Sequence, residues 1–232
     1  MREYYQLIQV ADPRQDSSTI LKILTAMAKK ELPCDLRLLN YYRQMPVSYP
    51  ATVTHVDQDM VELSVHKHQT VAMAAERNTI LKSTHFPHDV LAKVFSVKAE
   101  KSLAFVTNFA FVVVRAERRR FVRVEISEAL EGAFEGEGVA LKGRVMDISV
   151  GGVSIRAGAD ARVTTDMRGI VLLKLPGKSV EIPARLHKIA ETGEGRDYVF
   201  ELTATPRIEG EIAQFIFQRQ TELIREMKET VS

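Results

Sequence analysis

Between Val139 and Leu202, the chain contains short segments in which hydrophobic and polar residues alternate. Turn residues such as Pro176-Gly177 separate these segments. A period of two is typical of a β-strand with one buried face. The segments follow one another too closely for crossover helices to fit between them. This region therefore predicts five or six antiparallel strands that form a small barrel or sandwich. The predicted strands lie around residues 139–145, 153–155, 170–175, 182–186 and 198–202.

The first part of the chain predicts one helix followed by further strands. Asp16, Ser17 and Ser18 are good N-caps, and apolar residues then recur at helical spacing, so we expect a helix over residues 16–30 that Pro33 terminates. Two hairpins are expected after it. They comprise residues 47–56 with 60–65, around Asp57-Gln58-Asp59, and residues 90–97 with 102–114; a separate strand is expected at 34–39.

Helical spacing returns from Ile208. Its expected apolar stripe contains Ile212, Phe215, Ile216, Leu223 and Met227, with Arg219 and other charged residues on the opposite side. We predict a mainly β protein with two tandem small antiparallel β-barrel-like domains, an N-terminal helix and a C-terminal helix. The expected domains are 1–114, 115–206 and 207–232, the last being the helix. The stripe could also pair two chains, so the oligomeric state stays open.

Composition excludes several classes of protein. The 32 Lys and Arg residues nearly balance 30 Asp and Glu residues, which disfavours a protein coated with nucleic acid. A single cysteine, Cys34, cannot form an intramolecular disulfide or a Cys-rich zinc site, and it favours a reducing compartment. The start of the chain resembles no signal peptide, and no apolar run approaches the roughly 20 residues of a membrane span. We therefore expect a cytoplasmic protein without membrane insertion.

One motif is a run of arginines at the predicted domain boundary. Arg118, Arg119, Arg120 and Arg123 lie within six residues, and Arg115 precedes them. Guanidinium groups bind phosphate bidentately and pair with guanine O6 and N7. The run is either a solvated basic linker or part of an anion-binding site.

A second motif, Asp147-x-Ser149-x-Gly151-Gly152, lies between two predicted strands. Asp147 and Ser149 can point the same way from an extended chain. A carboxylate accepts from the amino and imino groups of guanine, and adjacent glycines admit a flat ligand closely or adopt positive φ. The alternative is a plain β-turn. Together, the two motifs favour a guanine nucleotide with several phosphate charges and no metal.

Arg119-x-x-x-Arg123 followed by Asp147-x-Ser149-x-x-Gly152 resembles the paired signature of PilZ domains, the bacterial receptors for the second messenger cyclic di-GMP. The resemblance extends over residues 116–206. The trailing helix and the preceding β domain are similar in placement to those of flagellar-brake-type PilZ proteins, whose N-terminal β domain is termed PilZN. By this resemblance the ligand-binding residues would be Arg118, Arg119, Arg123, Asp147, Ser149, Gly151 and Gly152.

The resemblance implies a non-enzymatic cyclic di-GMP effector. Ligand binding would order the arginine segment, change the interdomain arrangement and signal to a protein target, such as the flagellar motor, in motility or biofilm control. The alternatives are a nucleic-acid-binding regulator that uses the arginine run and a ligand-free PilZ interaction module. The six histidines are scattered without carboxylates or cysteine at ligand spacing, so we expect no metal site and no catalytic residues.

Overall fold

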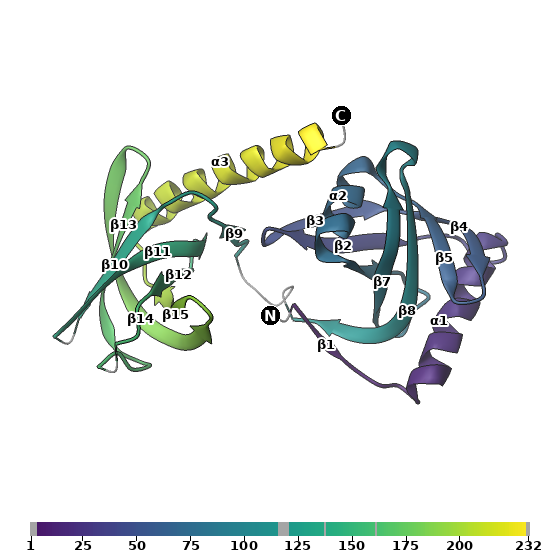
Figure 1. Ribbon diagram of the computed structural model, residues 1–232, viewed down its shortest axis with the longest axis horizontal. Helices are drawn as coiled ribbons and strands as arrows, with labels where there is room; N and C mark the ends of the chain where they lie inside the picture. Colours follow the sequence, from purple (N-terminus) through teal and green to yellow (C-terminus); the bar gives the residue numbers. More distant parts are fainter. Residues whose placement is uncertain (1–3, 116–120, 137, 161, 231–232) are drawn as a thin grey trace. The chain divides into compact units, whose positions relative to one another are not determined.

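The computed structural model describes residues 4–115, 121–136, 138–160 and 162–230 (Figure 1). It contains two compact units. The N-terminal unit holds helices α1 (Pro13–Ala28) and α2 (Lys67–Glu76) with strands β1 to β8. The C-terminal unit holds strands β9 to β15 and the first part of α3 (Pro206–Thr230), through Leu223. The domain limits at residues 114 and 206 stay predictions.

The N-terminal unit is an antiparallel sheet of eight strands in the order β3-β2-β6-β7-β8-β5-β4, with β1 paired to β8. Ile20 and Leu24 of α1 are fully buried in the same core as Leu63, Leu81 and Phe111. The strands are β1 (Tyr5–Leu7), β2 (Arg37–Tyr42), β3 (Met45–Pro50), β4 (Thr52–Asp57), β5 (Met60–Ser64), β6 (Asn78–Lys82), β7 (Asp89–Lys98) and β8 (Leu103–Val114).

Helix α1 begins three residues before the predicted start. Asp12 is the N-cap, and its Oδ1 accepts hydrogen bonds from the backbone N–H groups of Arg14 and Gln15, both at 3.0 Å. Asp16, which the sequence suggested as a cap, is buried in the first turn and accepts from the N–H groups of Val10 and Ala11. The predicted start of the helix was wrong because Pro13 occupies the first helical position, where its lack of a backbone N–H costs no hydrogen bond.

Both predicted hairpins are confirmed, with Asp57 opposite Met60 and Lys98 opposite Leu103. A short 3₁₀ turn, η1 (Ala99–Lys101), joins β7 to β8. The single strand expected over residues 47–56 is divided into β3 and β4. Helix α2 and strand β6 were not predicted. The apolar pattern of α2 is weak because polar side chains, including Gln69 and Thr70, are buried on it.

The C-terminal unit is a closed barrel, which confirms the predicted fold class. Six strands follow the ring β10-β13-β14-β15-β12-β11, and pairing of β10 with β11 closes it; β9 adds to β11 (Figure 1). The interior contains Val145, Ile155, Tyr198 and Phe200. The strands are β9 (Val124–Glu125), β10 (Glu131–Gly136), β11 (Val139–Ser149), β12 (Gly152–Ala157), β13 (Arg168–Leu175), β14 (Lys178–Thr192) and β15 (Gly195–Leu202).

Helix α3 adds Ile212 and Ile216 to the barrel core. Arg219 follows them at helical spacing and is 7% exposed, so its predicted place on the polar side was wrong. Its Nη1 donates to Glu222 Oε2 at 2.7 Å, and its Nη2 donates to the Ser127 hydroxyl. These partners, together with the apolar stem of the side chain, allow an arginine on the buried stripe. None of the helices in the described part of the chain combines the length and apolarity of a membrane crossing.

Candidate ligand-binding site on the C-terminal barrel

The β11–β12 hairpin places the second motif on the outside of the barrel. Ser149 pairs with Gly152, which closes a two-residue turn. Ile148 and Val153 belong to the barrel core. Because successive strand residues point to opposite faces, Asp147 and Ser149 both face outward. The common face that the sequence allowed for these two residues is therefore present.

The segment that leads into the barrel lies along this hairpin. In β9, Val124 pairs with Ile148 and Glu125 pairs with Asp147. This pairing brings Arg123 beside Asp147, with 3.4 Å between Nε and Oδ1. The Asp147 side chain is 3% exposed and the Arg123 side chain is 26% exposed. A carboxylate buried to this degree needs a nearby cation, and Arg123 supplies one.

Neither glycine has a positive φ, so neither is required for a left-handed backbone. Both instead allow neighbouring atoms to come closer than a side chain would permit. A Cβ on Gly151 would lie 2.9 Å from two ring carbons of Phe121. A Cβ on Gly152 would lie 3.0 Å from the carbonyl oxygen of Phe200. Gly151 therefore lets the aromatic ring at the start of the barrel segment rest on the hairpin turn.

Hydrogen bonds fix the turn in place. The Ser149 hydroxyl donates to the Gly152 carbonyl at 3.2 Å, and the backbone N–H of Leu202 donates to the Gly151 carbonyl at 3.1 Å. Ser149 is only 5% exposed. A buried hydroxyl with this local bond holds the backbone of the turn in one conformation.

The structure thus brings together five of the predicted site residues: Arg123, Asp147, Ser149, Gly151 and Gly152. Arg118 and Arg119 lie outside the described residues, as does Arg120. Arg115 belongs to the N-terminal unit, where its guanidinium donates to Gln6 Oε1 at 2.8 Å.

Sequence reasoning assigned no role to Phe121. In the sequence, Phe121 is recognisable only as an aromatic residue within the arginine run. Its packing against Gly151 becomes apparent only from the tertiary structure.

This arrangement can recognise a flat, anionic molecule that carries hydrogen-bond donors. The guanidinium attracts phosphate or stacks on a purine, and the Asp147 carboxylate accepts from amino or imino groups. The absence of side chains on Gly151 and Gly152 allows close approach to the backbone of the turn, which the Phe121 ring makes at Gly151. Across the ranges that the structure describes, no three His, Cys, Asp or Glu side chains are grouped to hold a metal ion.

Residues 117–218 match the family model described as the PilZ domain. Among curated proteins, none matches the chain.

Similar solved structures include YcgR of Escherichia coli in complex with c-di-GMP, with 16% identity over 94% of this chain and 96% of that one and a TM-score of 0.47. The MrkH–c-di-GMP complex of K. pneumonia has 13% identity over 90% and 96% of the two chains and a TM-score of 0.47. The Bacillus subtilis inhibitor of motility MotI/DgrA has 12% identity over 81% and 95% and a TM-score of 0.44. The domain assignment rests on the family match and on the paired motifs. The chain therefore contains a PilZ domain, which the family match places at residues 117–218.

Proposed function

We propose that this protein is a receptor for cyclic di-GMP. The observation that carries the proposal is the position of Arg123, from the first motif, beside the second motif: its Nε lies 3.4 Å from the buried carboxylate of Asp147, next to the Ser149–Gly152 turn. The proposed ligand-binding residues are Arg118, Arg119, Arg123, Asp147, Ser149, Gly151 and Gly152. The PilZ assignment of residues 117–218 supports the same ligand.

The chemistry of the ligand fits the residues in two ways. Its two phosphates carry a charge of about −2, which reduces the mutual repulsion of the crowded arginines. Its guanines present amino and imino donors to the carboxylate and the hydroxyl, and their faces can stack on a guanidinium plane. A nucleotide without both features would satisfy only half of the site.

We further propose that ligand binding changes the interdomain arrangement. The arginines lie in the sequence between the strands of the N-terminal unit and those of the barrel. An anion that binds several of these arginines restrains the segment that joins these two sets of strands. Binding then shifts the population of interdomain arrangements through its differential affinity for them. The altered surface signals to a protein target.

Control of motility or biofilm-type behaviour is the proposed output, with the flagellar motor as the first target to test. This part rests on the resemblance of domain order to flagellar-brake-type proteins.

The binding test is isothermal titration of cyclic di-GMP into the purified full chain and into Arg119→Ala, with GTP as the control ligand. Arg207→Ala is the matched control, because Arg207 is an exposed arginine whose partner is Glu211 of the same helix. We expect micromolar or tighter binding by the parent and Arg207→Ala, strong loss in Arg119→Ala, and no binding of GTP. Equal binding by Arg119→Ala and the parent would contradict the site.

Two outcomes would favour other functions. Nucleic-acid binding with steep salt dependence and no preference for the cyclic dinucleotide would indicate a nucleic-acid-binding regulator. Absence of all nucleotide binding would indicate an interaction module. For the signalling step, labels in the two units should report a ligand-dependent change of distance in the parent and none in Arg119→Ala.

A further inference from the structure

The outward face of the barrel continues past the signature residues, across β12 and β15 to β14. Cross-strand pairing places Asp147 opposite Ser154, Ser154 opposite Val199, and Val199 opposite Lys188. Directly paired residues of antiparallel strands point to the same side of the sheet. These four side chains therefore form one row across four strands, here called the Asp147–Lys188 row.

Two β-bulges create the two ends of this row. The register shifts between Val145 and Asp147 in β11 and between Leu186 and Lys188 in β14. Val145 and Leu186 are buried in the core, so without a bulge the residue two positions later would also face inward. Each bulge instead turns a charged side chain out. Bulges recur next to functional sites because they re-aim side chains in this way.

The row has a small side chain, Ser154, next to Asp147, and both of its ends are charged. Ser154 is 2% exposed, and neighbouring Gly152 has no side chain, so neither residue projects beyond the side chains around it. Lys188 is exposed, and among the described residues it forms no ion pair. Arg185 on the same strand is already engaged by Asp166 and Glu201.

The dimensions suit a molecule with two bases. Strands lie about 4.8 Å apart, so the backbones of Asp147 and Lys188 are separated by about 14 Å and those of Gly152 and Lys188 by about 12 Å. A lysine side chain reaches back over part of that distance. The face thus offers a hydrogen-bond acceptor at one end and a cationic donor at the other. Guanine O6 and N7 are acceptors that a lysine ammonium recognises.

We infer that Lys188 is a further ligand-binding residue, which contacts the O6 and N7 edge of the second guanine of the bound dinucleotide. The inference rests on the proposed function and extends its site from the signature residues to strand β14. The signature positions, Asp147 included, then hold one half of the ligand, and Lys188 at the other end of the row contacts the second half.

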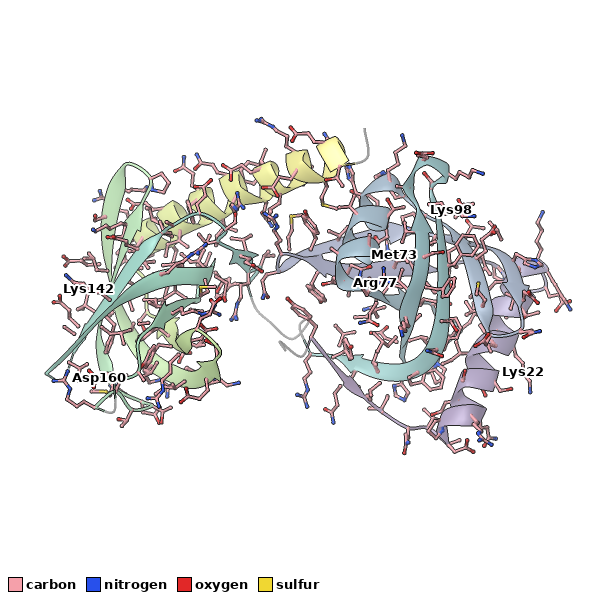
Figure 2. The ribbon with its side chains drawn as sticks, viewed as in Figure 1. Lys22, Met73, Arg77, Lys98, Lys142 and Asp160 are labelled. Carbon is pink, nitrogen blue, oxygen red and sulfur yellow. The ribbon has the colours of Figure 1, made fainter. Side chains whose placement is uncertain are left out.

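The test compares the cyclic di-GMP affinity of the parent with Lys188→Ala, Lys188→Arg and Lys142→Ala. Lys142 is an exposed lysine on the same barrel (Figure 2). It lies seven residues before Ser149 along β11, about 23 Å away at the usual rise of a strand. Its removal changes the net charge by the same amount without touching the row. Thermal unfolding of each variant checks that the barrel is intact.

We expect Lys188→Ala to bind about tenfold more weakly, as the loss of one charge-assisted hydrogen bond implies. Lys188→Arg should stay near the parent, because the arginine keeps a donor for O6 and N7, and Lys142→Ala should match the parent. The difference should shrink at high salt. If the parent binds and Lys188→Ala binds as well as the parent, this inference alone is overturned. The same holds if Lys142→Ala weakens binding as much as Lys188→Ala does. A parent that binds no cyclic di-GMP overturns the proposed function and this inference together.

Discussion

Nε of Arg123 lies 3.4 Å from Oδ1 of Asp147, and this pair joins the segment that enters the barrel to the β11–β12 hairpin. The carboxylate is nearly inaccessible to water, so its charge is compensated inside the protein without a nucleotide. A ligand that uses both side chains must either share this pair or replace it. The ion pair thus holds both side chains in place before any ligand binds, and a ligand that breaks it must offset the free energy that is lost.

Replacing Arg123 with Ala should lower the free energy of unfolding by about 1–3 kcal/mol, because a buried carboxylate loses its cation. Urea denaturation measures the change. The control is Arg123→Ala combined with Asp147→Asn, which also removes the negative charge of the carboxylate and should recover much of the stability. Equal stability of the single variant and the parent would mean that the pair contributes nothing to the fold.

Replacing Gly151 with Ala should weaken cyclic di-GMP binding. The new Cβ would lie 2.9 Å from the ring of Phe121 and force it off the turn, which moves the segment that carries Arg123. Gly158→Ala is the matched control, since a Cβ there meets no atom within 4 Å. Titration calorimetry of both variants tests the contact. If the two variants bind alike, Phe121 does not position the segment.

Replacing Arg219 with Ala should destabilise the C-terminal unit by about 1–3 kcal/mol. The change removes the hydrogen bonds to Glu222 and Ser127 and exposes part of the barrel surface that the side chain covers. Arg225→Ala, on the exposed side of α3, should have little effect. Thermal unfolding measures the stability of both variants. Equal losses of stability would contradict a stabilising role for the buried Arg219 side chain.

Glu76 should make the N-terminal unit sensitive to pH. Burial raises the pKa of this carboxyl above its ordinary value of 4.5, although hydrogen bonds from the Asn40 amide and the Tyr41 backbone oppose the shift. Because the folded-state pKa is the higher one, protonation stabilises the fold. This stabilisation is complete below pH 4.5 and is lost as the pH rises through the folded-state pKa.

Relative to Glu76→Gln, the parent should therefore lose stability as the pH rises above 4.5 and through the raised folded-state pKa of Glu76. Denaturant unfolding at a series of pH values measures the difference. Glu100→Gln, at an exposed position of η1, serves as the control. A difference between parent and Glu76→Gln that does not vary with pH would exclude the burial effect.

The barrel could be predicted from the sequence because alternation is a local property of each strand. Residues such as Ile182, Ala184 and Leu186 carry the period of two by themselves, and the structure buries all three. Strand β10 was missed because the part after Phe134 reads as a turn. Strand β9, only two residues long, is defined by its partner β11 and leaves no pattern of its own. The C-terminal sheet therefore has seven strands where the sequence indicated five or six.

The residues of the candidate site were selected from the sequence, which indicated only part of their geometry. The two motifs identified Arg123, Asp147 and Ser149, and the structure brings these together. The bulge before Asp147 and the ring of Phe121 on Gly151 depend on contacts between distant segments, which no spacing encodes. Arg219 was misplaced for the same reason, because its buried position depends on Ser127, ninety-two residues away.

Closure of the barrel by β10 and β11 restricts how another protein can recognise it. Among the described strands of the barrel ring, each has a neighbour on both sides. The ring strands therefore lack the free edges at which partners add a strand to an open sheet. A partner that binds the ring itself would contact side chains on the outside of the barrel. Substitutions of exposed side chains can therefore probe recognition of the barrel residue by residue, without disturbing the backbone pairing that closes it.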